Sequence, residues 1–178
     1  VMHKFVGVAL AAMLAIAGCG GSKEQTSSTG APAKGQRLRF AVIPKALSIP
    51  VFNYAKLGAE RQAKEYGNVD ILWNAPADAD QLKQKEILES YITQKVDGLA
   101  ISALNGDFLT DTINRAVDAG IPVVMWDSDA PKSKRAAFYG VDDLASGRIL
   151  GEQAVKLLNG KGTIAIITSI GATNLQLR

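Results

Sequence analysis

The stretch "VDGLAISALNGDFLTDTINRAVDAGIPVVMWDSD", residues 96–129, decides the fold. It begins with an apolar run at 96–102 and ends with a second apolar run at 122–127. Between these runs, the apolar residues of 109–117 recur at spacings of three and four, which predicts one buried face of a helix. Gly120 then ends that helix. The stretch therefore predicts strand, helix and strand, the repeating unit of a parallel sheet.

The same alternation extends outward in both directions. Further apolar runs predict strands at 38–44, 69–74, 137–142 and 163–169. Helical periodicity predicts further helices over 50–66, from a start at Asp78–Gln81 to Gln94, and around 150–158. The apolar runs are continuous instead of alternating, so both faces of the sheet are expected to be covered. We therefore predict an α/β protein with a doubly wound parallel sheet.

The residues directly after each strand are the candidate site, because such folds bind ligands beyond the carboxyl ends of their strands. The polar candidates are Lys45, Asn105, Asp127, Asp129 and Asn174, and the aromatic candidates are Phe52 and Trp126. Charged and amide groups beside an aromatic ring suit a ligand rich in hydroxyls, such as a sugar. Core packing is an equal alternative for Phe52 and the favoured one for Trp126.

Two carboxylates, Asp127 and Asp129, leave other interpretations open. Paired carboxylates hydrolyse a glycosidic bond when they are correctly spaced across it, so a secreted carbohydrate-active hydrolase is the main alternative. A cation site has fewer nearby oxygen ligands to support it. The next two acids, Asp142 and Asp143, are favoured as caps of the helix that follows them.

The N-terminus resembles a bacterial lipoprotein signal over residues 1–18. A short cationic start is followed by an apolar run at 5–17, which is shorter than the roughly 20 residues that span a bilayer. The sequence "IAGC" at 16–19 resembles a lipobox, so we predict that Cys19 carries the lipid. Residues 19–37 are rich in Gly, Ser, Thr and Lys, which predicts a flexible tether.

The composition excludes several classes of function. The chain has one cysteine and one histidine, His3, and a mature chain starting at Cys19 would keep no histidine and no free thiol. We therefore expect no His-based catalysis, no His/Cys metal site and no cofactor. The net charge of +3 is scattered, so we expect no nucleic-acid partner. No G-x-G-x-x-G follows the first strand, and "NGKGT" at 159–163 precedes a strand instead of a helix.

Several segments together resemble the type I periplasmic sugar-binding proteins, the substrate-binding components of sugar ABC importers. They are the lipobox and tether, "VIPK" at 42–45, "VDGLAIS" at 96–102, "AVDAGIPVVMWDSDAP" at 116–131 and "FYGVDDLASGRILGE" at 138–152. The resemblance extends over nearly all of residues 38–178. Within the family, "IPK" and "WDSD" look most like the branch that binds rhamnose or the furanosyl autoinducer sugar, while other parts look like ribose binders.

This resemblance implies roles for individual residues. Asp127 would accept hydrogen bonds from ring hydroxyls, Lys45 would donate to the sugar, and Phe52 would stack on the ring. Asn174 and Arg178 would reach the ligand from a second lobe.

The sequence departs from the ribose binders at three positions. Ile49 and Val51 stand where that branch has an asparagine and the first aromatic of its loop, and Ser128 stands where it has an arginine. These departures argue against ribose itself as the ligand.

The family fold has two lobes that close over the ligand about a hinge. Residues 38–143 correspond to the N-terminal lobe and residues 144–178 to the beginning of the second lobe. We therefore expect an incomplete chain that binds sugar weakly or not at all. The resemblance also implies no enzymatic activity, a monosaccharide or sugar-like ligand and ABC permease subunits as partners. It implies a monomer anchored by lipid in the periplasm or at the cell surface. A sugar-sensing receptor would use the same capture step and stays a further alternative.

Overall fold

The computed structural model describes residues 35–169 and 171–178. The predicted signal peptide, the lipid site Cys19 and the predicted tether up to residue 34 lie outside the described residues. Those assignments therefore stay predictions. Within the described part of the chain, no helix is both long enough and apolar enough to cross a membrane.

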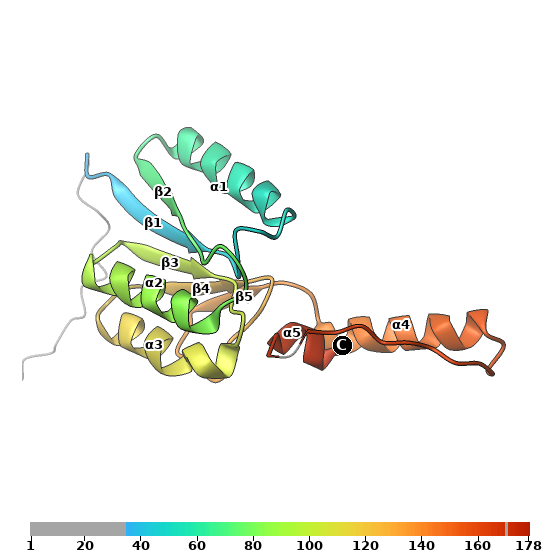
Figure 1. Ribbon diagram of the computed structural model, residues 1–178. Helices are drawn as coiled ribbons and strands as arrows, with labels where there is room; N and C mark the ends of the chain where they lie inside the picture. The colour runs from blue at the N-terminus through green and yellow to red at the C-terminus, as the bar shows by residue number, and fades with distance from the viewer. Residues whose placement is uncertain (1–34, 170) are drawn as a thin grey trace, which may run out of the picture. The chain divides into compact units, whose positions relative to one another are not determined.

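A sheet of five parallel strands, in the order β2-β1-β3-β4-β5, forms the centre of the fold (Figure 1). The strands are β1 (Leu38–Ile43), β2 (Val69–Trp73), β3 (Gly98–Ile101), β4 (Val123–Trp126) and β5 (Ala137–Tyr139). The chain runs from β1 to β2 on one side and then crosses back over β1 to reach β3. The predicted doubly wound parallel sheet is confirmed, and its switch point lies between β1 and β3.

Three helices cover the two faces of this sheet. They are α1 (Phe52–Tyr66), α2 (Gln81–Thr93) and α3 (Gly106–Asp118). Helices α2 and α3 lie together on one face, and α1 lies on the opposite face (Figure 1). Successive strand residues point to opposite faces, so Ala41 and Ile43 are fully buried in the core against α2 and α3, whereas Phe40 and Val42 face α1.

The two faces differ in how well they are covered. The core under α2 and α3 includes Ile43, Leu88, Leu99, Ile101, Leu109, Ile113, Val123 and Met125. On the other face, α1 leaves an apolar groove of about 370 Å³ between itself and the strands. Val124, which lines this groove, is 41% exposed. The expectation that both faces are covered is therefore met only in part, because a single helix is too narrow to cover five strands.

Short polar residues cap the starts of α2 and α3, whereas α1 begins at Val51 without a side-chain cap. Asp80 caps α2, and its carboxylate accepts from the backbone N–H groups of Leu82 (2.9 Å) and Lys83 (3.0 Å). The sequence placed this start at Asp78, two positions too early, because either aspartate suits a cap and only the backbone geometry chooses between them.

Replacing Asp80 by alanine is expected to lower the free energy of unfolding by about 1 kcal/mol, because two backbone donors of α2 lose their acceptor. Urea denaturation followed by circular dichroism measures the change. Asp78→Ala is the matched control, since Asp80 and not Asp78 makes the capping bonds. An equal loss of stability in the two variants would contradict this assignment.

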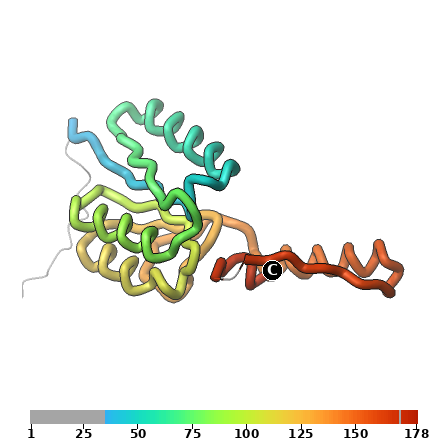
Figure 2. Tube along the Cα trace, viewed as in Figure 1, coloured from blue at the N-terminus to red at the C-terminus, as the bar shows by residue number. Residues whose placement is uncertain are grey.

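After β5 the chain forms α4 (Asp143–Leu157) and the short helix α5 (Thr173–Leu177). Asp142 caps α4 by accepting from the N–H of Ala145 at 2.9 Å, as predicted, whereas the carboxylate of Asp143 binds Arg178 instead. The chain reverses direction after α4 and returns toward α5 (Figure 2). Helix α4 buries only Asp143, so its apolar residues have no core to join within the described part of the chain.

The strand predicted at 163–169 is wrong. These residues form no strand, and Ile166 and Ile167 are 81% and 99% exposed. A strand exists only through hydrogen bonds to a neighbouring strand, and the structure as described offers this segment no second sheet to join. Apolar, β-branched composition alone was therefore misleading at this position.

Candidate binding site at the carboxyl edge of the sheet

Asp127 is the first residue after β4, and its backbone is strained. Its φ is +58°, a left-handed conformation that residues with a side chain rarely adopt. The N–H of Asp127 donates to Tyr139 O at 3.0 Å, and the next N–H, of Ser128, turns back to Trp126 O at 2.6 Å. Such strain is concentrated at functional sites in proteins. The backbone geometry therefore singles out Asp127 among the acids of the edge.

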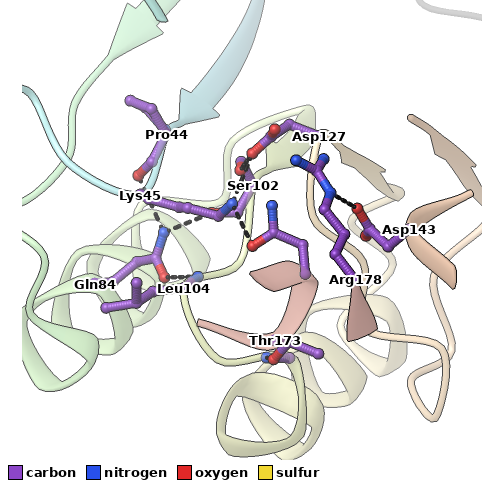
Figure 3. A network of polar contacts seen from close by, with 11 residues as sticks. Pro44, Lys45, Gln84, Ser102, Leu104, Asp127, Asp143, Thr173 and Arg178 are labelled. Carbon is purple, nitrogen blue, oxygen red and sulfur yellow. Dashed lines mark hydrogen bonds and ion pairs between the residues drawn. The ribbon is translucent and has the colours of Figure 1, made fainter. Parts of the chain in front are cut away.

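The Asp127 carboxylate binds two side chains from the switch point. Its Oδ2 accepts from Lys45 Nζ at 2.8 Å and from Ser102 Oγ at 2.6 Å (Figure 3). Lys45 follows β1 and is only 6% exposed, whereas the Asp127 side chain is 33% exposed. A buried ammonium needs a paired charge, and Asp127 provides it. Within the described residues, Oδ1 of Asp127 has no hydrogen-bond partner and is left as a free acceptor.

Helix α5 contributes a fourth polar group to this cluster. Asn174 is buried and its Oδ1 accepts from Lys45 Nζ at 3.1 Å. The neighbouring Thr173 fixes the helix to the end of β3, since its N–H donates to Leu104 O at 3.3 Å and its Oγ1 accepts from the N–H of Gly106 at 3.1 Å. The structure thus brings together three of the predicted site residues, Lys45, Asp127 and Asn174.

Asp129 lies in the same loop, but it pairs with Arg135 and not with Lys45. Both of its oxygens accept from Arg135, through Nε and through one terminal nitrogen at 2.7 Å. These hydrogen bonds raise the pKa of the Arg135 guanidinium above its usual value, although burial opposes the effect. The Asp129 backbone lies against Gly106, where a Cβ would clash with the Asp129 carbonyl oxygen. The ion pair therefore joins two parts of the loop between β4 and β5, and Gly106 allows the start of α3 to approach that loop closely.

Aromatic side chains border the cluster on the α1 side of the sheet. The ring of Phe52 is only 7% exposed and meets Trp126 edge-on, with ring centroids 5.2 Å apart. Trp73, at the end of β2, lies 6.4 Å from Trp126. Phe52 is thus both part of the core and adjacent to the residue that precedes Asp127. The indole N–H of Trp126 is buried without a hydrogen-bond partner among the described residues.

Two further candidates have partners away from the Lys45 cluster. Asn105 caps α3 by accepting from the N–H of Phe108 at 3.0 Å, and its amide nitrogen donates to Gln81 at 3.1 Å. Arg178 binds Asp143 at 2.7 Å (Figure 3). Asp143, Asp129 and Asn174 line one pocket of about 190 Å³ between α5 and the loops that follow β4 and β5. Asp129 and Asp143 are thus each paired with an arginine, whereas Asp142, which also lines this pocket, accepts from the N–H of Ala145.

Sequence reasoning missed Ser102, Gln84 and Arg135. Ser102 was assigned to the third strand, but β3 ends at Ile101, so Ser102 is the first residue of the edge. Gln84 lies in the polar stretch "QLKQKE" of α2, where no pattern distinguishes a buried glutamine from exposed ones. If the predicted strand had ended at Ile101, the last apolar residue of the run, Ser102 would have been among the candidate residues.

The chain is similar to known proteins in both sequence and fold. A family model described as "Periplasmic binding protein domain" matches residues 40–178. The chain is 29% identical over 152 residues to the D-ribose/D-allose-binding protein of Pseudomonas aeruginosa, an alignment that covers 80% of this chain and 48% of the relative.

Solved structures of binding proteins are similar to this chain in both fold and sequence. The glucose-galactose binding protein GanP from Geobacillus stearothermophilus has a TM-score of 0.75 and 34% identity, covering 80% of this chain and 51% of that one. An ABC transporter solute-binding protein from Burkholderia graminis, solved with D-arabinose, has a TM-score of 0.75 and 34% identity, covering 82% and 50%. The chain thus spans about half the length of the relatives that it matches.

Proposed function

Because the chain belongs to the type I periplasmic sugar-binding proteins, we propose that it captures a sugar or sugar-like ligand outside the cytoplasm for an ABC importer. The observation that supports this most is the Asp127 carboxylate. One of its oxygens is fixed by Lys45 and Ser102, while the other has no hydrogen-bond partner among the described residues, and the side chain is 33% exposed. A fixed carboxylate with a free oxygen is a strong acceptor for a ligand hydroxyl.

The charge balance of the site favours a neutral ligand. Asp127 is paired with Lys45, Asp129 with Arg135 and Asp143 with Arg178. An ionic ligand would have to displace one partner of such a pair, whereas hydroxyls can add to the acceptors and donors that remain. Carbohydrate hydroxyls both donate and accept, so one ligand can satisfy the carboxylate and the amide of Asn174 together.

The proposed roles follow from this arrangement. Lys45, Asp127 and Asn174 bind hydroxyl groups, and Phe52 provides apolar surface through its contact with Trp126. Asp129 borders the neighbouring pocket, and Arg178 binds Asp143 of the same pocket, so both contact the ligand at its periphery in this proposal.

Capture proceeds, in this proposal, by closure of two lobes over the ligand. The segment 144–178 begins the second lobe, and the contacts of Thr173 and Asn174 with the end of β3 and with Lys45 are of the kind that hold a closed form. Lipid attachment at Cys19, a periplasmic or cell-surface location, docking on permease subunits and a monomeric state complete the proposal.

The hydrolase alternative has less support. A glycosidase needs two carboxyl groups directed at the bond that breaks, but both oxygens of Asp129 are bound by Arg135. The relatives that match are named as binding proteins, and none of the names reported above is that of an enzyme. Capture without chemistry is therefore the better account of the two acids.

Titration of the chain with D-ribose, D-allose and D-arabinose tests the proposal. We expect one of these sugars to shift the backbone NMR signals of Lys45, Ser102 and Asp127, with a dissociation constant of about 1 mM or weaker. The affinity is expected to be low because the described residues enclose a ligand only from the edge of one sheet and from α5. Shifts that map far from this edge, or release of 4-nitrophenol from nitrophenyl glycosides, would contradict the proposal.

A further inference from the structure

The ladder between β1 and β3 ends just before the residues that form the site. Its last bond runs from the N–H of Ser102 to Ile43 O at 2.9 Å. In this register the next donor toward β3 would be the N–H of Lys45, but among the described residues no backbone bond joins it to Ser102 O. Beyond this bond, other contacts must fix the separation between the segments that follow β1 and β3. That separation matters because Lys45 and Ser102 must reach the same oxygen of Asp127.

Gln84 supplies these contacts. Its Nε2 donates to Pro44 O at 3.0 Å and to Ser102 O at 2.8 Å, and its Oε1 accepts from the N–H of Leu104 at 3.0 Å (Figure 3). The side chain is fully buried, and both N–H donors of the amide are used. The amide thus bridges the two strand ends one step beyond the last ladder bond.

The position of Gln84 is itself well fixed. It lies in the first turn of α2, where its N–H donates to the carbonyl of the capping residue Asp80 at 3.0 Å. One turn later, Leu88 is fully buried in the core beneath the sheet. Helix α2 therefore fixes the backbone from which the Gln84 amide reaches the two strand ends.

We propose that Gln84 is a positioning residue of the sugar site, an inference that rests on the proposed function. By setting the separation of the strand ends after β1 and β3, it holds Lys45 Nζ and Ser102 Oγ on Asp127 and leaves Oδ1 directed at the ligand. Gln84 itself does not touch the sugar. Its removal frees two carbonyls and one N–H to seek other partners, so the strand ends separate and the carboxylate loses its fixed direction.

The test compares Gln84→Met, which keeps the volume but no hydrogen bonds, with Leu88→Ala as the matched control. Leu88→Ala removes core packing from the same face of α2 and lowers stability without touching the site. The first measurement is the side-chain carboxyl ¹³C shift of Asp127 in the sugar-free chain. We expect Gln84→Met to move it to the value of an exposed aspartate and Leu88→Ala to leave it unchanged.

The second measurement is the affinity for D-arabinose by NMR titration. We expect Gln84→Met to weaken it about tenfold, and Leu88→Ala to leave it within about twofold of wild type. In the background of Lys45→Met the effect of Gln84→Met on the Asp127 carboxyl shift should be smaller, because the residue acts in part through the Lys45–Asp127 pair. If Gln84→Met does not fold, Gln84→Asn takes its place, since its shorter amide cannot reach all three backbone groups.

The two measurements distinguish a failure of the positioning role from a failure of the proposed function. An Asp127 signal that stays unchanged in Gln84→Met, or that moves equally in Leu88→Ala, would overturn the positioning role. A wild-type chain that binds none of the sugars would contradict the proposed function, while the carboxyl signal would still decide whether Gln84 positions Asp127.

Discussion

Replacement of Asp127 by asparagine is expected to weaken sugar binding about 30-fold, which places it beyond measurement for a chain of millimolar affinity. The substitution removes the charge of the carboxylate, and hydrogen bonds to a charged group contribute about 1.5–3 kcal/mol. Asparagine is the informative choice because it tolerates the left-handed backbone at this position, where φ is +58°. Titration with the sugar that binds the wild-type chain checks this, and no saturable shift of the NMR signals is expected for Asp127→Asn.

Asp118→Asn is the matched control for this experiment. Asp118 is an exposed acid that binds Lys134 on the surface, so its replacement removes one negative charge without touching the carboxyl edge of the sheet. We expect the affinity of Asp118→Asn to equal that of wild type. If Asp127→Asn bound the sugar as well as Asp118→Asn does, the carboxylate would have no part in binding.

Lys45→Met is expected to lower the free energy of unfolding by about 2 kcal/mol. Methionine keeps most of the volume of the lysine stem, but Asp127 loses its counter-charge and Asn174 loses its donor. Removing one partner of a fully buried pair costs about 3–5 kcal/mol. A smaller value is expected here because the Asp127 side chain is 33% exposed and keeps the bond from Ser102. Urea denaturation at neutral pH measures the change.

A double variant separates the lost charge from the lost packing. Lys45→Met combined with Asp127→Asn leaves no unpaired charge, so we expect it to recover more than half of the stability lost by Lys45→Met alone. Lys132→Met, which breaks an exposed pair with Asp107, serves as the surface control and should change stability by less than about 0.5 kcal/mol. A Lys45→Met chain as stable as the surface control would show that the pair does not hold the two strand ends together.

The β-α-β pattern was readable from the sequence because it is local. The apolar runs and the helical stripes each lie within one element, and the continuous runs identify strands of a parallel sheet without knowledge of their neighbours. The segment 163–169 has the same composition but remains exposed. Its failure has a physical cause, since the pattern predicts what a segment prefers and only a second strand can satisfy that preference.

The site was predictable only to the extent that it follows from topology. Asp127 directly follows β4 and Lys45 lies two residues after the end of β1, so the rule that carboxyl ends converge was enough to place them together. The partner of Asp129 was not predictable, because Arg135 lies six positions away in a loop whose turn has no sequence signature. Gln84 was beyond reach for a different reason. Its role depends on the separation of two strand ends, which no single stretch of sequence encodes.

The aromatic contacts at the end of β4 have a practical consequence. The chain has only two tryptophans, and these are Trp73 and Trp126, whose rings lie 6.4 Å apart at the edge where the ligand is proposed to bind. The tryptophan fluorescence of the whole chain therefore originates at two residues, Trp126 beside Asp127 and Trp73 at the end of β2. An optical reporter is thus built into the molecule, and its emission reads the state of this edge without any attached dye.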